Sequence, residues 1–247
     1  MNKIKRFKLI ACEILFREVC LCASKCKNII DIDFLPKGLH DMGQSKMSKR
    51  LQQELDRVET DKYDAILLCY GLCNNGVKGL QSKLPIVIPK AHDCITLLLG
   101  SKEKYNEYFR SNPGTYFKST GWTERDKGPE NNELSIPSQL GMNKTYQEYV
   151  ELYGEDNALY LMEILGNQMK NYSKIVYIDT QTGEFDSYKK SAKQLADNNN
   201  WQYEEVTGNT RLIFKLLNGD WNDEEFLTVP PDSIIEPTNT EEIIGYI

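Results

Sequence analysis

The fold of this chain is decided by the segment Tyr63-Asp-Ala-Ile-Leu-Leu-Cys-Tyr-Gly-Leu-Cys-Asn-Asn-Gly76 and by its neighbour Leu84-Pro-Ile-Val-Ile-Pro-Lys-Ala-His-Asp-Cys94. Each segment contains a short apolar run, at 65–68 and 86–88, which is typical of a strand buried on both faces of a sheet. Each run leads directly into cysteine, histidine, aspartate or glycine. Because ligands of open α/β sheets bind beyond the carboxyl ends of such strands, the two segments predict a functional site at that edge.

Strands and helices are predicted to alternate on both sides of these segments. Apolar runs and helical spacings predict strands at 7–12, 29–35, 175–179, 201–206 and 225–229, and one more short strand within 113–122 that ends at Gly121. They predict helices at 13–26, 45–58, 74–80, 94–109, 144–153, 155–172, 187–198 and 211–217. This βαβ alternation favours parallel sheets. The predicted fold class is therefore α/β, with two Rossmann-like βαβ halves whose mostly parallel sheets pack around a central cleft.

A change in composition divides the chain. Residues 123–143 are polar, lack periodicity and contain Gly128-Pro129, so a linker or mobile loop is predicted there. The expected domains are a Cys/His-rich α/β domain at 1–122, which carries the site, and a second α/β domain at 144–247.

Composition excludes several classes of protein. The chain has 247 residues, of which 40% are hydrophobic and 10% aromatic, enough for a buried core. The net charge of −6 without a sustained basic face argues against a nucleic-acid partner. The sequence contains no run of 18 apolar residues, so it predicts no membrane-spanning helix. The basic N-terminus is interrupted at Cys12-Glu13 and does not form a signal peptide, so a cytoplasmic location is expected.

Cysteine usage is the sharpest compositional feature. All seven cysteines (12, 20, 22, 26, 69, 73 and 94) and both histidines (40 and 92) lie within the first 94 residues. An odd number of cysteines without a secretion signal argues against a disulfide framework. Reduced thiols concentrated in one half are expected to be metal ligands, redox groups or nucleophiles, with buried apolar cysteine as the alternative for some of them.

The predicted metal ligands are Cys12, Cys73 and Cys94. Each follows a predicted parallel strand, so all three are expected at one edge of the sheet. Three thiolates suit zinc or an iron–sulfur cluster. Either His92 or His40 would be the fourth ligand or a proton-transfer group; the alternative is three buried cysteines and two surface histidines. Cys20, Cys22 and Cys26 lie on a predicted helix, where helix packing explains them.

Carboxylates and glycines surround these thiols. Glu13 and Asp93 each adjoin a predicted ligand and could orient it or act as a general base, so Glu13, His40, His92 and Asp93 are the candidate catalytic residues. The turn that contains Gly71, Asn74 and Gly76 could offer backbone N–H groups to a cofactor or let the backbone approach one closely. The alternative is an ordinary turn between a strand and a helix.

Several motifs of the chain resemble a known family. They are Ala11-Cys-Glu-Ile-Leu-Phe-Arg-Glu18, Phe34-Leu-Pro-Lys-Gly-Leu-His-Asp41, Tyr70-Gly-Leu-Cys-Asn-Asn-Gly76, Ala91-His-Asp-Cys-Ile-Thr-Leu-Leu-Leu-Gly-Ser101 and Pro113-Gly-Thr-Tyr116. Together they resemble a family of unknown function from anaerobic bacteria and methanogens, over nearly the whole chain. The resemblance implies a link to anaerobic one-carbon metabolism, because genes of that family often stand beside those of corrinoid methyltransferases.

Three hypotheses follow. The first is a metal-dependent enzyme of methyl or one-carbon transfer, in which a Cys/His-bound metal such as zinc activates a small-molecule or thiol substrate. The second is an iron–sulfur redox or lyase-type protein that uses the three cysteines. The third is a non-enzymatic accessory protein whose partner is a corrinoid protein or a methyltransferase.

Overall fold

The computed structural model describes residues 3–112, 114–125, 150–151, 172–238 and 240–247. The predicted linker at 123–143 lies outside the described residues from residue 126 onward. The helices predicted at 144–153 and 155–172 also lie outside them, apart from residues 150, 151 and 172.

The larger sheet, sheet A, has the strand order β2-β1-β3-β4-β8. Strands β2, β1, β3 and β4 pair in parallel, and β8 joins the edge of the sheet antiparallel to β4. Their bounds are β1 Arg6–Cys12, β2 Ile29–Leu35, β3 Ala65–Cys69, β4 Ile86–Pro89 and β8 Phe226–Val229. Every residue of β3 and β4 is buried, as their uninterrupted apolar runs predict.

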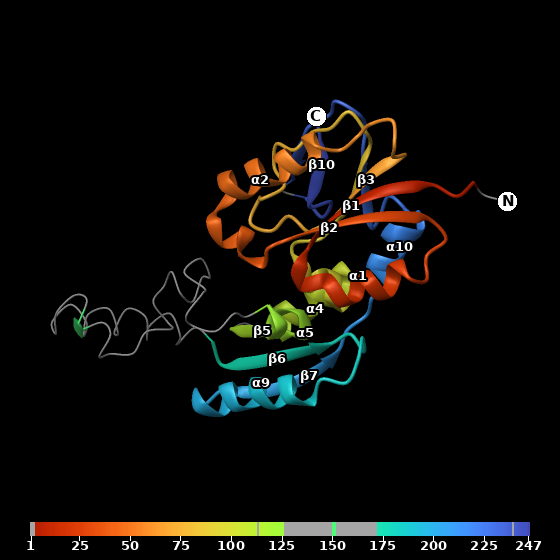
Figure 1. Cartoon of the computed structure of the whole chain (residues 1–247). Helices are drawn as coiled ribbons and strands as arrows, with labels where there is room; N and C mark the ends of the chain where they lie inside the picture. The colour runs from red at the N-terminus through yellow and green to blue at the C-terminus, as the bar shows by residue number, and fades with distance from the viewer. Residues whose placement is uncertain (1–2, 113, 126–149, 152–171, 239) are drawn as a thin grey trace.

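Helices cover both faces of sheet A. Figure 1 shows α1 (Phe16–Ala23) beside α10 (Arg211–Asn218) on one side of the sheet and α2 (Gln44–Asp56) on the other. From β1 the chain moves to β2 at one flank, and it later returns to β3 at the opposite flank of β1. In doubly wound folds, a reversal of this kind creates a crevice at the carboxyl ends of the two central strands. Here those strands are β1 and β3.

The smaller sheet, sheet B, contains three parallel strands in the order β5-β6-β7. Their bounds are β5 Thr115–Ser119, β6 Lys174–Asp179 and β7 Gln202–Thr207, and α9 (Asp186–Asn198) packs against one face. In Figure 1 this unit lies below sheet A, with α9 on its outer side.

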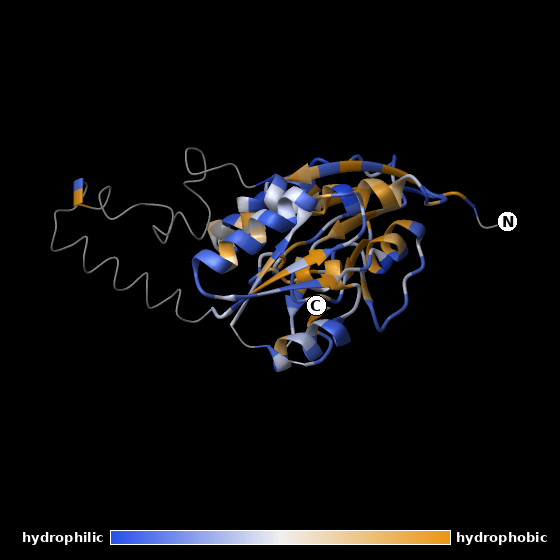
Figure 2. Cartoon of the chain, turned by 90° about the horizontal axis from the view of Figure 1, so that it is seen from below, coloured by the Kyte–Doolittle hydropathy of each residue, from blue (hydrophilic) through white to orange (hydrophobic). Residues whose placement is uncertain are grey.

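The two sheets share one hydrophobic core. Ile175 and Tyr177 of β6 point to α9, whereas Phe117, Val176 and Ile178 belong to the same buried cluster as the strands of sheet A. Figure 2 shows the apolar strands gathered inside the molecule and polar residues along the outward helices. The fold class is confirmed as mixed α/β, with a mostly parallel sheet A and a parallel sheet B consistent with Rossmann-like halves.

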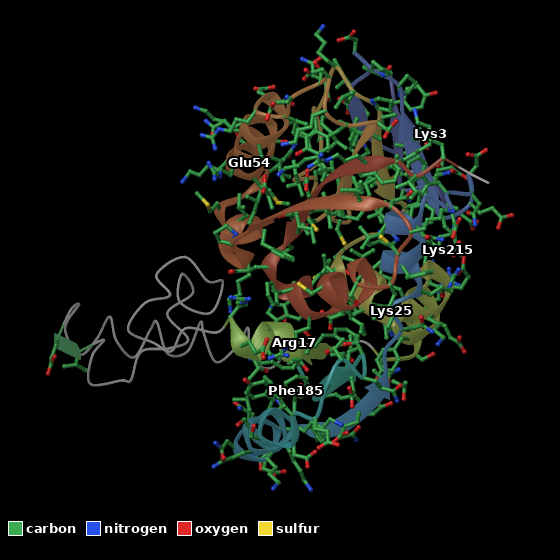
Figure 3. The ribbon with its side chains drawn as sticks, turned by 45° about the vertical axis from the view of Figure 1, so that its right-hand side comes forward. Lys3, Arg17, Lys25, Glu54, Phe185 and Lys215 are labelled. Carbon is green, nitrogen blue, oxygen red and sulfur yellow. The ribbon has the colours of Figure 1, made fainter. Side chains whose placement is uncertain are left out.

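Polar contacts also join the two sheets. Arg17 of α1 forms a bidentate pair with Glu124 of α5 (Thr120–Glu124), and its guanidinium lies 4.4 Å from the ring centroid of Phe185. Figure 3 shows Arg17 and Phe185 where the two units meet. Glu18 Oε1 accepts a hydrogen bond of 2.5 Å from Thr180, directly after β6.

The strands do not follow the predicted division into 1–122 and 144–247. Strand β5, which precedes the predicted linker, pairs with β6, and β8 returns from the second half to sheet A.

Short elements complete the fold. Short 3-10 helices follow β1 and β2, namely η1 (Glu13–Leu15) and η2 (Lys37–Met42). The chain ends in a hairpin of β9 (Ile235–Pro237) and β10 (Ile244–Tyr246).

Two predicted helices need correction. The helix predicted at 94–109 is broken into α3 (Cys94–Leu99) and α4 (Lys102–Ser111), because Gly100 adopts φ +84° and Ser101 caps the second helix. The helix predicted at 74–80 is a series of turns, because Asn74 and Asn75 have positive φ angles. Among the described helices, none is both long and apolar enough to cross a membrane.

Candidate functional site

Three neighbouring strands bring the predicted ligands to one edge of sheet A. Strand β1 ends at Cys12, β3 ends at Cys69 and continues to Cys73, and β4 continues through His92 to Cys94 at the start of α3. Since β1, β3 and β4 are adjacent and parallel, their carboxyl ends lie side by side. The sequence-based placement of Cys12, Cys73 and Cys94 therefore agrees with the topology.

The loops after β3 and β4 are joined by their backbones. Leu72 N donates to Ala91 O at 2.8 Å, and Cys73 N donates to His92 O at 2.9 Å. Gly71 makes this approach possible, because a Cβ atom there would lie 2.6 Å from the backbone N of Asp93. The glycine predicted to bind a cofactor thus brings the loop of Cys73 against the loop of Cys94.

The turn that carries Cys73 is strained. Cys73, Asn74 and Asn75 have φ angles of +46°, +56° and +63°, three consecutive non-glycine residues in the left-handed region. Asparagine tolerates this region better than most residues, but cysteine rarely adopts it. Strain of this kind is concentrated at active sites and ligand-binding turns. The observed conformation therefore marks this turn as a functional candidate.

The three thiols share one electrostatic environment. Burial raises the pKa of Cys73, and the neighbouring Asp93 carboxylate and Cys12 raise it further, while the backbone N–H groups of Gly71 and Cys94 oppose the rise. Burial also raises the pKa of Cys94, with additional contributions from Asp93, Cys73 and Cys12. Cys73 and Cys94 are close enough to influence each other's ionisation, and without a cation both stay protonated at neutral pH.

The side chains are not arranged as a finished metal centre. No group of three or more His, Cys, Asp or Glu side chains that could hold a metal ion occurs within the described residues. None of the seven cysteines, all of which lie in the described ranges, forms a disulfide. The structure thus places three soft sulfur donors in one region but does not direct them at a common point.

Asp93 and His92 have structural contacts of their own. Asp93 Oδ1 accepts from the backbone N of Ile95 at 2.9 Å as the N-cap of α3, and its Oδ2 accepts from the Tyr105 hydroxyl at 3.1 Å. Burial raises the pKa of Asp93, although these hydrogen bonds partly counteract it. His92 is exposed, and its ring stacks on Tyr105 with centroids 5.3 Å apart.

Glu13 and His40 lie at the ends of β1 and β2. Glu13 Oε1 accepts from the backbone N of Lys37 at 2.9 Å, which fixes the start of η2, and its Oε2 lies 3.9 Å from Arg125 Nη1. His40 belongs to η2, whose backbone follows β2 at the same edge of sheet A, but its side chain lies outside what the structure describes.

The two other residues predicted to bind a cofactor have different surroundings. A Cβ atom at Gly76 would lie 2.1 Å from the Met47 sulfur, so Gly76 allows α2 to pack closely against the turn. Asn74 is exposed within the left-handed turn.

A deeper pair of thiols adjoins the site. Cys69 is fully buried, and burial raises its pKa well above the usual range, with smaller contributions from Cys22, Cys12 and Glu18. Burial raises the pKa of Cys22 to about 11, and its Sγ lies 3.7 Å from Thr210 O. These thiols pack between sheet A and its helices, as expected of buried apolar cysteine.

Sequence reasoning missed Tyr70 and Arg125. Tyr70 is only 3% exposed, yet its hydroxyl has no hydrogen-bond partner among the described residues, and its electrostatic neighbours include Cys12 and Cys73. The Nε of Arg125 is likewise buried without a partner in the described part of the chain, and its guanidinium lies near Glu13. For Tyr70, the sequence feature that could have indicated a site residue was its position directly after a buried strand, between Cys69 and Gly71.

A shallow pocket lies elsewhere, between α4 and β7. Its volume is about 310 Å³, and its lining contains Leu99, Lys104, Glu107, Tyr108, Ser111, Asn112, Val206 and Thr207. None of these residues belongs to the thiol region, so the pocket and the thiols are separate features.

Comparison with known proteins identifies a family. The family model described as "Protein of unknown function (DUF1638)" matches residues 34–217. This span includes His40, Cys73, His92 and Cys94, whereas Cys12 and Glu13 precede it. No curated protein and no solved structure matches the chain.

Proposed function

The chain belongs to the DUF1638 family, which is described as of unknown function. From the thiols at one edge of sheet A we propose that it is a metal-dependent enzyme of one-carbon or methyl-transfer metabolism. Its centre is a thiolate site for zinc or an iron–sulfur cluster, formed by Cys12, Cys73 and Cys94. The site lies at the carboxyl edge of sheet A, at the reversal of strand order between β1 and β3.

The observation that supports this proposal most is that three adjacent strands bring Cys12, Cys73 and Cys94 to one edge of sheet A. Burial and the Asp93 charge keep Cys73 and Cys94 protonated in the metal-free protein. A divalent cation reverses that preference, because metal coordination deprotonates thiols. The backbone hydrogen bonds between the loops of Cys73 and Cys94 keep these two residues near each other.

The surrounding residues suit a reaction at sulfur. A bound zinc ion supplies a Lewis acid that lowers the pKa of a substrate thiol. The backbone N–H groups of Gly71 and Cys94 stabilise negative charge on Cys73, and the buried strand ends exclude water. A small-molecule or thiol substrate fits this chemistry, and a corrinoid protein or methyltransferase is the proposed partner. Seven cysteines without a disulfide suit a reducing compartment such as the cytoplasm.

An iron–sulfur cluster is the second candidate. It is favoured by the all-sulfur donor set, because His92 is exposed and engaged with Tyr105. Three thiolates can hold a cluster with one open iron, which serves redox or lyase-type reactions. An accessory role for corrinoid methyltransferases becomes the better account if no metal binds.

The test is the metal content and visible spectrum of protein purified without oxygen. The site variants are Cys12→Ala, Cys73→Ala and Cys94→Ala. The control is Cys20→Ala, because the pKa of Cys20 is raised by burial alone, with no contribution from the other thiols. We expect about one metal centre per chain in the wild type and in Cys20→Ala, and loss in the three site variants. Zinc without colour supports the transfer enzyme, and iron with sulfide supports the cluster. Absence of metal from the wild type contradicts both.

A further inference from the structure

Lys90 is a buried lysine at the carboxyl end of β4. It directly follows the last residue of the strand, and its side chain is only 7% exposed. The ammonium group donates to Asp223 O at 2.5 Å and to the carboxylate of Glu242. A buried ammonium group needs a counterion, because removing an unpaired charge from water is costly. Since ligands of parallel sheets bind beyond this end of the strands, the lysine is placed where an anionic ligand would bind.

The carboxylate that pairs with Lys90 comes from the C-terminal hairpin. Glu242 lies in the turn between β9 and β10, and its side chain is 59% exposed. The two partners therefore differ in their access to water. A carboxylate that is mostly exposed loses little when it leaves the pair, whereas the buried ammonium group would be left without a counterion. The pair thus joins a fixed cation to an anion that another anion can replace.

The backbone beside Glu242 is strained. Ile243 has a φ angle of +65°, and Ile244 N donates to Glu242 O at 2.7 Å, which closes a three-residue turn around Ile243. A β-branched residue rarely adopts a positive φ, and turns of this type are strained. Ile243 and Ile244 are buried in the core of sheet A, so packing holds the turn in this conformation. Such strain is concentrated at ligand sites and switch regions, which marks this turn as one that opens during function.

A second ammonium group lies at the same turn. Lys102, at the start of α4, donates from Nζ to Glu241 O at 3.4 Å. The hydrogen bond and the charge of Lys90 lower the pKa of Glu242, and the charge of Lys102 lowers it further. Two lysines that follow different elements thus act on one carboxylate. Because the group already held there is a carboxylate, the arrangement itself indicates the chemical class of the ligand.

We propose that Lys90 is the anion-binding residue of a site for a small carboxylate ligand, and that Glu242 occupies this site in the free protein as an autoinhibitory substitute for the ligand. The carboxylate of the ligand displaces that of Glu242 from the Lys90 ammonium group, and the turn around Ile243 relaxes. This site requires no metal, so it is independent of the thiol site proposed above.

The experiment measures the binding of propionate to the 247-residue chain by calorimetry, with sodium chloride at the same ionic strength as the reference. Glu242→Ala removes the competing carboxylate, and Lys90→Met in the same variant removes the cation at similar volume. Glu236→Ala is the matched control, because Glu236 belongs to the same hairpin and pairs at 3.2 Å with Lys78, whose side chain is 44% exposed. Hydrogen exchange of the Ile244 amide, which donates to Glu242 O, reports opening of the turn in the wild type.

We expect Glu242→Ala to bind propionate about tenfold more tightly than the wild type, because a tethered carboxylate competes at a high effective concentration. Neither Glu236→Ala nor the double variant with Lys90→Met should show this gain. In the wild type, saturating propionate should accelerate exchange of the Ile244 amide, and sodium chloride should not.

Equal affinity of the wild type and Glu242→Ala for propionate would overturn the proposal, and so would an equal gain in Glu236→Ala or in the double variant. The exchange measurement depends on no substitution. If saturating propionate leaves the exchange of Ile244 unchanged, Glu242 is a permanent structural partner of Lys90 and the proposal is wrong. Tighter binding of inorganic phosphate than of propionate to Glu242→Ala would overturn the assignment to carboxylates.

Discussion

At the scale of single residues, the thiol region depends on backbone positions that few side chains tolerate. Gly71 lets two loops touch, and the turn after it holds three residues at positive φ. The sequence predicted which cysteines and glycines lie here, because strand ends can be read from apolar runs. It could not predict the positive φ angles, or that the buried Tyr70 hydroxyl has no hydrogen-bond partner among the described residues, because both depend on contacts between segments that are distant in the chain.

Substitution of Asn74 tests the strain in the turn. Asn74→Ala should lower the free energy of unfolding by about 1 kcal/mol, because an alanine side chain is disfavoured at φ +56° and lacks the local hydrogen bonding of asparagine. Asn74→Gly should leave stability equal or higher, since glycine adopts positive φ freely. Urea denaturation measures both variants. If Asn74→Ala is as stable as the wild type, the left-handed turn is not present in solution.

Substitution of Gly71 tests the contact between the loops. Gly71→Ala should destabilise the protein by about 1–3 kcal/mol and abolish metal binding, because its Cβ would lie 2.6 Å from Asp93 N and 2.8 Å from Ala91 O. Gly245→Ala in β10 is the control, since its Cβ would meet a side-chain methyl group at 3.1 Å. Thermal denaturation measures the stability of both variants, and metal analysis measures their metal content. Full metal binding by Gly71→Ala would show that the loops need not touch.

At the scale of secondary structure, local signals located the elements well but did not assign them to sheets. The strand at Ile29–Leu35 matches its prediction at both ends, because Pro36 and Asn28 bound the apolar pattern. The break at Gly100 was missed, because apolar spacing continues across it. The place of β8 in sheet A could not be predicted, since pairing with β4 depends on a contact more than a hundred residues away.

Glu225 connects α10 to the strand β8, and its ionisation should make stability depend on pH. Burial alone would raise the pKa of Glu225, but hydrogen bonds from Arg211, Lys215 and Asn222 outweigh it and lower the pKa to about 2. An unfolded glutamate titrates near 4.3, so the folded state favours the ionised form. The stabilisation is complete above about pH 4.3 and is lost as the pH falls through about 2.

Glu225→Gln should therefore be less stable than the wild type at pH 7, by on the order of 1–2 kcal/mol once solvent screening is allowed for. The difference should shrink between about pH 4.3 and pH 2. Urea denaturation at a series of pH values measures it. A difference that stays constant down to pH 2 would mean that the Glu225 carboxylate is not stabilised by its three partners.

At the scale of the whole molecule, strands from the two sides of the predicted linker at 123–143 pair with each other. The predicted boundary relied on the polar composition of 123–143, and composition cannot show that β5 and β6 pair across it. Phe117, Val176 and Ile178 extend one core between the sheets. The predicted fold class was right because each half carries its own βαβ pattern.

The shared core predicts one cooperative unfolding transition. Trp221 packs on Phe7 in the unit of sheet A, and Trp201 packs near Tyr116 in that of sheet B, so variants that retain one of these tryptophans report on each unit. Fluorescence and circular dichroism should give one midpoint in each variant. Ile178→Ala should destabilise both units together by about 2–5 kcal/mol. Separate midpoints for Trp201 and Trp221 would instead support two independent domains.

The thiolate site is the central claim, and X-ray absorption at the metal edge of anaerobically purified protein tests it most directly. For zinc, the account predicts about three sulfur ligands at about 2.3 Å, reduced in Cys73→Ala and unchanged in Cys20→Ala. For an iron–sulfur cluster, it predicts iron surrounded by sulfide and thiolate sulfur. A metal bound by nitrogen and oxygen alone, or a protein that holds no metal, would contradict the account.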